Sequence, residues 1–323
     1  MAKLKSIIGC EITTNEIRAV EIAKENGVYK ILAMGYIPLE EGVVEEGFIR
    51  DADRFNDAIT QLIASGNFQT TEIAIGVNNE NIIMRYAAFP KVEGDRLRNM
   101  VLLQAQEFIP IPIQEMEVDY VVAGESKDDN DMLQTNVMLI AARKQMLEGY
   151  INIFTASRLQ IQEIDASILS YCRGINQICG DIRYGIVNLT DDILNFMVVQ
   201  GSEIAMVRSI TIPEKMQNAV NSIFKNSRDE SYTEEDVTSV AAFLTQETSS
   251  TISYYLMQNS IPIDKVYFIM NSSAASKIMP ALQENIYVPI EIPQFYPELQ
   301  SASVTPLGEY ASCIGIAISS LEG

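Results

Sequence analysis

The sequence contains the same strand-turn-strand pattern twice, and this repetition limits the fold more than any other feature. Near the start, apolar and alternating segments predict a three-stranded meander at residues 6–12, 17–23 and 29–37. Near the middle, similar segments predict a second meander at residues 184–189, 193–199 and 203–212. One common offset pairs Glu11 with Asn188 and Thr13 with Thr190. The chain is therefore predicted to be a duplicated α/β protein.

A different arrangement lies between the two meanders. After a helix at 53–65 and a strand at 72–77, the pattern predicts a strand, a helix, two strands and a helix. These five elements are expected at residues 82–89, 95–108, 117–124, 135–142 and 144–157. Their order is typical of a small α/β module inserted into the first unit. The second unit continues with a helix at 233–258, for which Thr233 is the expected N-cap.

The composition excludes several classes of function. A formal charge of −20 repels phosphate backbones and anionic head groups, so we expect no nucleic-acid partner. The absence of histidine excludes Ser-His and Cys-His nucleophiles and removes the commonest metal ligand. The cysteines form no Cys-x-x-Cys pair, and we interpret all four as small buried apolar residues: Cys10, Cys172, Cys179 and Cys313. We therefore expect no metal site.

The distribution of apolar residues indicates a protein without a membrane span. Purely apolar runs such as residues 137–142 are far shorter than the roughly 20 residues that cross a bilayer. The N-terminal residues show no apolar signal region. We expect a soluble, cytoplasmic protein with no direct membrane insertion.

Several stretches resemble the PilM family of type IV pilus assembly proteins, which is actin-like and related to the division protein FtsA. The most specific is residues 104–120, Gln-Ala-Gln-Glu-Phe-Ile-Pro-Ile-Pro-Ile-Gln-Glu-Met-Glu-Val-Asp-Tyr. Residues 9–22, 35–47 and 137–143 are similar to other parts of that family, and the resemblance covers nearly the whole chain.

This resemblance implies an actin-like ATPase fold with two RNase H-like lobes. The first lobe is expected to comprise residues 1–79, 163–182 and 307–323, and the second lobe residues 183–306. The inserted module is expected at residues 80–162. This division agrees with the meanders and the module predicted from the residues themselves.

In the family, ATP and magnesium lie between the lobes, held by two phosphate hairpins and a glycine-rich adenosine turn, and this chain departs at all three places. The first hairpin carries Glu11, Thr13 and Thr14, and the second carries Asn188 and Thr190. Asn271, Ser272 and Ser273 stand at the adenosine turn. Side chains thus occupy positions where backbone must approach phosphate closely.

These departures predict weak or lost nucleotide binding. Glu16, Asp191 and Asp192 add negative charge where a triphosphate would lie. We interpret the two adjacent aspartates as turn residues, not as an acid/base pair, and expect no catalytic residue. No cofactor is expected, although Glu11 retains a hard oxygen ligand for magnesium.

The segment Phe108, Ile109, Pro110, Ile111 and Pro112 has two interpretations. Proline ends the preceding helix, so the segment is consistent with a helix stop whose apolar side chains pack into the module. The resemblance implies instead a groove wall that holds the cytoplasmic N-terminal tail of PilN, a single-span membrane protein. The two interpretations are compatible.

The resemblance implies a scaffold that is no enzyme. Its expected partners are PilN, the pilus motor ATPases and the inner-membrane platform protein, and its expected place is the inner face of the cell membrane, reached through PilN. The alternatives are a Mg-ATP-binding actin-like ATPase and a filament-forming protein like FtsA.

Overall fold

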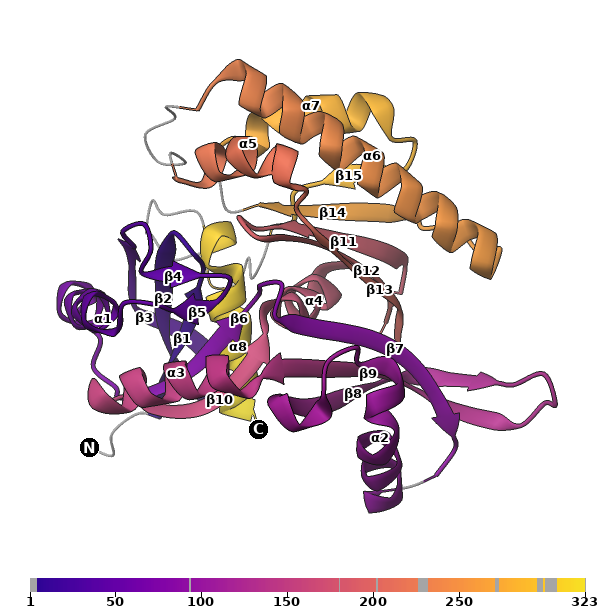
Figure 1. The fold of residues 1–323 in the computed structure, drawn as a ribbon, viewed down its shortest axis with the longest axis horizontal. Coiled ribbons are helices and arrows are strands. Elements are labelled where there is room, and N and C mark those ends of the chain that lie inside the picture. Colours follow the sequence, from indigo (N-terminus) through magenta and orange to yellow (C-terminus); the bar gives the residue numbers. More distant parts are fainter. Residues whose placement is uncertain are drawn as a thin grey trace.

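The protein consists of two lobes that share one architecture, and a small module projects from the first lobe (Figure 1). The structure is a computed structural model that describes residues 5–92, 94–179, 181–201, 203–225, 232–270, 273–294, 299 and 307–322. Each lobe contains a five-stranded sheet in which an antiparallel meander is joined to two parallel strands. The duplication predicted from the two meanders is confirmed.

The first lobe is built on the sheet order β10-β6-β1-β2-β3. Its strands are β1 (Ser6–Ile12), β2 (Glu16–Glu25), β3 (Val28–Pro38), β6 (Glu72–Val77) and β10 (Gln160–Ala166). Helices α1 (Ala52–Gly66) and α3 (Lys144–Ala156) pack against β3 and β10, whereas α4 (Ser167–Cys179) and α8 (Ala311–Glu322) pack together beside β1. A short ribbon of β4 (Val44–Glu45) and β5 (Phe48–Ile49) follows β3.

The second lobe repeats this plan with the sheet order β13-β12-β11-β14-β15. Its strands are β11 (Arg183–Leu189), β12 (Ile193–Gln200), β13 (Glu203–Thr211), β14 (Lys265–Met270) and β15 (Ile290–Glu291). Helices α5 (Glu214–Lys225), α6 (Glu234–Asn259) and α7 (Ala275–Asn285) cover its outer face. Thr233 is the N-cap of α6, because its hydroxyl accepts from the N–H of Asp236 at 3.1 Å, as predicted.

The inserted module is a three-stranded sheet carrying one helix. The sheet has the order β7-β9-β8, with β7 (Ile82–Pro90), β8 (Met116–Lys127) and β9 (Leu133–Arg143) all antiparallel. Helix α2 (Asp95–Phe108) lies against it, and a 3₁₀ turn at Ile113–Glu115 leads into β8.

The boundary of the module differs from the expected residues 80–162. Strand β10 begins at Gln160 and pairs in parallel with β6, so the expected boundary falls inside a strand of the first-lobe sheet. Helix α3 also packs in the first lobe, where Tyr150 and Phe154 are buried in its core. By packing, the module is limited to the segment from β7 to β9.

One hydrophobic core joins the two lobes. Side chains on the inner face of the second sheet, such as Tyr184 and Ile186, are buried in the same cluster as Ile8 of β1 and Ile175 of α4. The Tyr184 hydroxyl donates to Asn176 of α4 at 2.6 Å. Helix α4 therefore connects the sheets and sets how the two meander turns face each other.

Strand β1 and helix α8 approach so closely that only glycine fits between them. A Cβ atom on Gly9 would lie 1.8 Å from the carbonyl oxygen of Cys313. Because a side chain at this position would force the helix away, Gly9 holds α8 against the first-lobe sheet.

Candidate functional site

The first meander turn is closed by its own threonine hydroxyl. Thr13 Oγ1 lies 3.3 Å from the backbone nitrogen of Asn15 and 3.2 Å from that of Glu16, and it accepts from both. The N–H of Thr13 donates to the carbonyl of Glu16 at 3.0 Å. In a phosphate-binding turn, convergent N–H groups of this kind face the anion. Here the N–H groups of Thr13, Asn15 and Glu16 are hydrogen-bonded within the turn itself.

The second meander turn has the same construction at the equivalent position. Thr190 Oγ1 accepts from the backbone N–H groups of Asp192 at 3.4 Å and Ile193 at 3.2 Å. The N–H of Thr190 donates to the carbonyl of Ile193 at 3.0 Å. The pairing of Thr13 with Thr190 in the sequence thus corresponds to one hydrogen-bonding role in two lobes.

The two turns are joined directly across the cleft between the lobes. Thr14 Oγ1 lies 3.1 and 2.9 Å from the two carboxylate oxygens of Asp192, to which it donates. Asn15 Nδ2 donates to Asp191 Oδ2 at 2.8 Å. Gln217 of α5 donates to the carbonyl of Asp191 at 2.9 Å. The aspartates interpreted as turn residues therefore also hold the lobes together.

A buried chain of amides closes the cleft behind the turns. Asn78, just after β6, donates to Asn188 Oδ1 of β11 at 2.6 Å and accepts from Asn195 Nδ2 of β12 at 2.6 Å. Asn195 in turn accepts from the hydroxyl of Ser209 at 2.7 Å. Asn188 is only 2% exposed. Its side-chain oxygen, at the position where the resemblance places a phosphate-hairpin residue, is thus engaged by the first lobe.

The space left between the turns is very small. Its volume is about 20 Å³, and its lining residues are Glu11, Thr13, Asn15, Glu16, Asn188, Leu189, Thr190 and Phe224. A cavity of this size holds roughly one water molecule. The structure therefore brings Glu11, Thr13, Asn188 and Thr190 together around one cavity, and the space that they enclose is too small for a triphosphate.

The carboxyl groups of the cleft are held in an environment that disfavours charge. Burial raises the pKa of Glu11, while Arg18, its cross-strand neighbour, opposes the rise. Burial, followed by the nearby Asp192, raises the pKa of Asp191 well above its usual range. Burial raises the pKa of Asp192 to about 6, against the lowering effect of the Thr14 hydroxyl. A further anion at this place would be repelled by each carboxylate that ionises.

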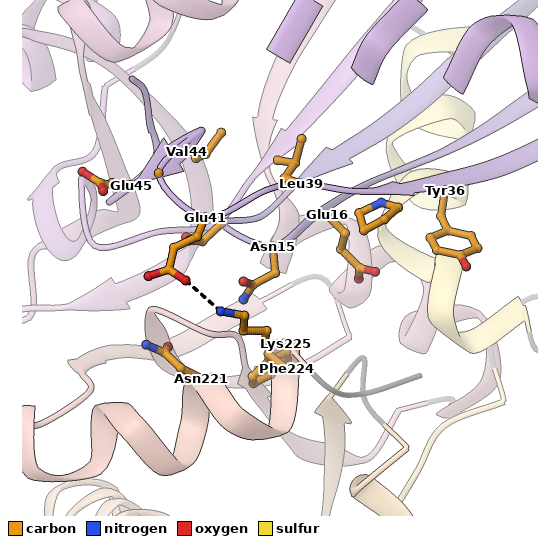
Figure 2. Close-up of a pocket in the computed structure, with 13 residues that line it drawn as sticks. Asn15, Glu16, Tyr36, Leu39, Glu41, Val44, Glu45, Asn221, Phe224 and Lys225 are labelled. Carbon is orange, nitrogen blue, oxygen red and sulfur yellow. Dashed lines mark hydrogen bonds and ion pairs between the residues drawn. The ribbon is translucent and has the colours of Figure 1, made fainter. Parts of the chain in front are cut away.

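A wider pocket of about 400 Å³ opens beside the turns, between the loop after β3 and helix α5 (Figure 2). An ion pair spans it, with Lys225 Nζ 2.7 Å from Glu41 Oε2. Phe224 and Tyr36 contribute apolar surface, and Glu16 adds a carboxylate. Thr14 lines this pocket and not the 20 Å³ cavity.

The predicted adenosine turn is only partly described. Asn271 and Ser272 lie outside the described residues. Ser273 precedes α7, and its hydroxyl lies 3.1 Å from that of Tyr232. Ser273 does not line the 20 Å³ cavity. Among the described residues, no group of three or more acidic or cysteine side chains is placed to hold a metal ion.

The apolar segment after α2 is a helix stop held by one glutamine. Helix α2 ends at Phe108, whose ring packs 5.8 Å from that of Phe89, and Ile109 is buried beside Ala105. Gln106 accepts from the N–H of Ile113 at 2.9 Å and donates to the carbonyl of Ile111 at 3.3 Å. The interpretation as a helix stop is confirmed.

The same segment also presents a surface. Pro110 and Pro112 are exposed and Ile111 is half-buried. The segment ends where the module returns to the first lobe, because Arg143 pairs with Glu115 at 3.2 Å and Lys144 donates to the carbonyl of Gln114 at 3.2 Å. The role of this segment in binding a PilN tail stays a prediction.

The sequence interpretation missed Asn78, Asn195 and Gln106, which hold the cleft and the segment in shape. The sequence could have indicated Asn78, because two asparagines directly follow the buried strand β6. It could not have indicated Asn195 and Gln106, since each stands within an ordinary strand or helix pattern.

A family model described as type IV pilus assembly protein PilM matches residues 9–209. The chain belongs to the PilM family. The matched region includes both meander turns, the inserted module and the segment from Phe108 to Pro112. It therefore contains most of the residues that close the cleft.

Solved structures confirm the actin-like fold of this PilM-family chain. A "PilM-PilN type IV pilus biogenesis complex" is similar with a TM-score of 0.75 and 19% identity, over 98% of this chain and 99% of that chain. The protein EutJ from Carboxydothermus hydrogenoformans has a TM-score of 0.55 and 11% identity, over 97% and 89%. A Bacteroides thetaiotaomicron protein with an actin-like ATPase fold and unknown function has a TM-score of 0.50 and 9% identity, over 90% and 93%.

Within the described part of the chain, every helix is too short or too polar to cross a membrane.

Proposed function

We propose that this PilM-family protein is a scaffold of a type IV pilus assembly machine that binds the cytoplasmic tail of a PilN-like membrane protein and does not use nucleotide. The observation that carries the proposal is the pair of threonine-capped turns, joined directly across the cleft. Phosphate binding at a turn needs free N–H donors, and the hydroxyls of Thr13 and Thr190 each accept from two N–H groups of their turn.

The tail-binding site is proposed at the segment from Phe108 to Pro112. The solved relative described as a PilM-PilN complex supports a PilN-like partner. The segment is held by Gln106, so a partner would meet a preorganised surface and lose less conformational freedom on binding. Through that tail the scaffold lies at the inner face of the membrane, where it links PilN to motor ATPases and the platform protein.

Calorimetry with the full chain tests both parts. With Mg-ATP we expect no heat of binding, because about 20 Å³ between the turns cannot admit a triphosphate. Low-micromolar binding of Mg-ATP would overturn the scaffold proposal in favour of an ATP-binding, actin-like ATPase. The double variant Thr13→Gly, Thr190→Gly removes the hydroxyls that accept from the turn N–H groups. Its heat of binding with Mg-ATP is the comparison for any weak heat seen with the wild type.

The tail site is tested with the synthetic N-terminal peptide of the cognate PilN. We expect Ile111→Asp to weaken binding at least about tenfold, because a buried charge in an apolar contact costs more than 1.4 kcal/mol. Met132→Asp is the control, since Met132 is an exposed apolar side chain away from the segment. If the two variants bind the peptide with equal affinity, the tail binds at another site.

A further inference from the structure

Strand β13 is an open edge of the second-lobe sheet. It pairs with β12 on one side only, and among the described residues no other strand pairs with its outer side. An edge strand presents unpaired N–H and C=O groups along its outer side. Such groups are a template for another extended chain.

A groove of about 820 Å³ runs along this edge. It is lined by four consecutive strand residues, Ala205 to Arg208. Because successive residues of a strand point to opposite faces, a cavity that touches four in a row lies against the edge and not against one face. The groove therefore gives access to backbone over about 13 Å, at roughly 3.3 Å per residue.

Aromatic side chains form the walls of the groove. Tyr254 of α6 is 56% exposed and Tyr86 of β7 is 40% exposed, and both line it. The module covers the beginning of the strand, where a Cβ on Gly124 would lie 3.2 Å from the side chain of Glu203. The module strands β7 and β8 therefore lie against part of β13, and the groove reaches the strand from Ala205 to Arg208.

Among the described residues that line the groove, the one cationic side chain is Arg208, and it is ion-paired. Arg208 donates to Thr251 Oγ1 at 2.6 Å and to Glu247 Oε2 at 3.2 Å, so its charge is neutralised within the second lobe. The other polar side chains that line the groove are those of Gln258 and Asn259. On a chain with a formal charge of −20, this groove without an unpaired charge suits an uncharged segment.

We propose that the β13 groove captures an extended, uncharged segment of a partner protein by strand addition. The segment pairs its backbone with the outer side of β13, and alternate apolar side chains contact Tyr86 and Tyr254. The unpaired strand edge selects this occupant, because a helix has already used its backbone groups and cannot complete a ladder. This surface is separate from the interlobe cleft and from the segment Phe108 to Pro112.

The test uses a display library of random linear decapeptides, selected on the full-length chain. We expect enriched peptides that alternate apolar residues, most of them β-branched or aromatic. Their affinity should fall at least tenfold on Tyr254→Asp and stay unchanged on Tyr287→Asp, an exposed tyrosine outside the groove. Thermal melting confirms that both variants are folded.

N-methylation of an enriched peptide distinguishes strand addition from simple apolar contact. Methylation of every second residue should abolish binding in one register and leave it in the other, because only alternate N–H groups face β13. The proposal is overturned if nothing is enriched over the double variant Tyr86→Asp, Tyr254→Asp, or if methylation acts equally in both registers. It is also overturned if Ile111→Asp lowers the affinity for the enriched peptides and Tyr254→Asp does not.

Discussion

Asn15 of the first lobe donates from Nδ2 to Oδ2 of Asp191 in the second lobe at 2.8 Å, across 176 residues of chain. With the bond from Thr14 to Asp192, it makes the two turns one unit. Their contact turns the cleft into a structural joint.

Replacing Asn78 with alanine should destabilise the protein strongly. The change removes the donor to Asn188 Oδ1 and the acceptor of Asn195 Nδ2, so two buried polar atoms lose the partner that Asn78 provides. Each unsatisfied buried group costs about 1–3 kcal/mol, so we expect the free energy of unfolding to fall by roughly 2–5 kcal/mol. Urea denaturation measures it, and Asn130→Ala, on an exposed turn, is the control. An effect as small as that of the control would show that the amide chain does not hold the lobes.

Asp192→Asn should reduce the dependence of stability on pH. Burial raises the pKa of folded Asp192 from its ordinary 3.8 to about 6, so the folded state keeps this proton more tightly than the unfolded chain. The resulting stabilisation is complete below about pH 4 and is lost as pH rises to about 6. The wild type should therefore lose up to about 3 kcal/mol relative to the variant over this window. Urea denaturation at several pH values measures the free energy of unfolding of both proteins. The same dependence on pH in the two proteins would contradict this prediction.

Gly9→Ala should prevent α8 from docking on the first sheet. The added Cβ would meet the Cys313 carbonyl at 1.8 Å, and neither backbone can yield without moving the helix. We expect a loss of about 3 kcal/mol or more. Gly149→Ala in α3 is the matched control, because a Cβ there meets nothing within 4 Å and should stabilise by about 0.5–1 kcal/mol. Thermal unfolding compares them, and similar melting temperatures would contradict the close approach.

The four cysteines should differ in reactivity. Cys10, Cys172 and Cys313 are buried, whereas Cys179 is only half-buried. Burial raises the pKa of all four thiols, which lowers the fraction of reactive thiolate further. With iodoacetamide, peptide mapping by mass spectrometry should find Cys179 modified first, and all four modified once urea unfolds the chain. Early modification of Cys10 or Cys313 would show that the region around β1 and α8 opens in the native state.

Much of the local structure could be predicted from short-range patterns. The two meanders, the helix capped at Thr233 and the end of α2 before Pro110 each depend on residues within a few positions of one another. Strand β10 was missed because most of its residues are polar and a register shift between Ile161 and Glu163 breaks the alternation of apolar residues that marks a strand. The expected boundary at residue 162 failed for the same reason.

The sequence by itself determined the duplicated fold, the family and the absence of glycine from the two meander turns. Only the tertiary structure decided that the cleft is shut. That outcome depends on the bonds from Thr14 and Asn15 to the second turn and on Asn78 reaching Asn188. These contacts join residues more than a hundred positions apart, and they exist because α4 and the shared core bring two separate sheets to one fixed distance.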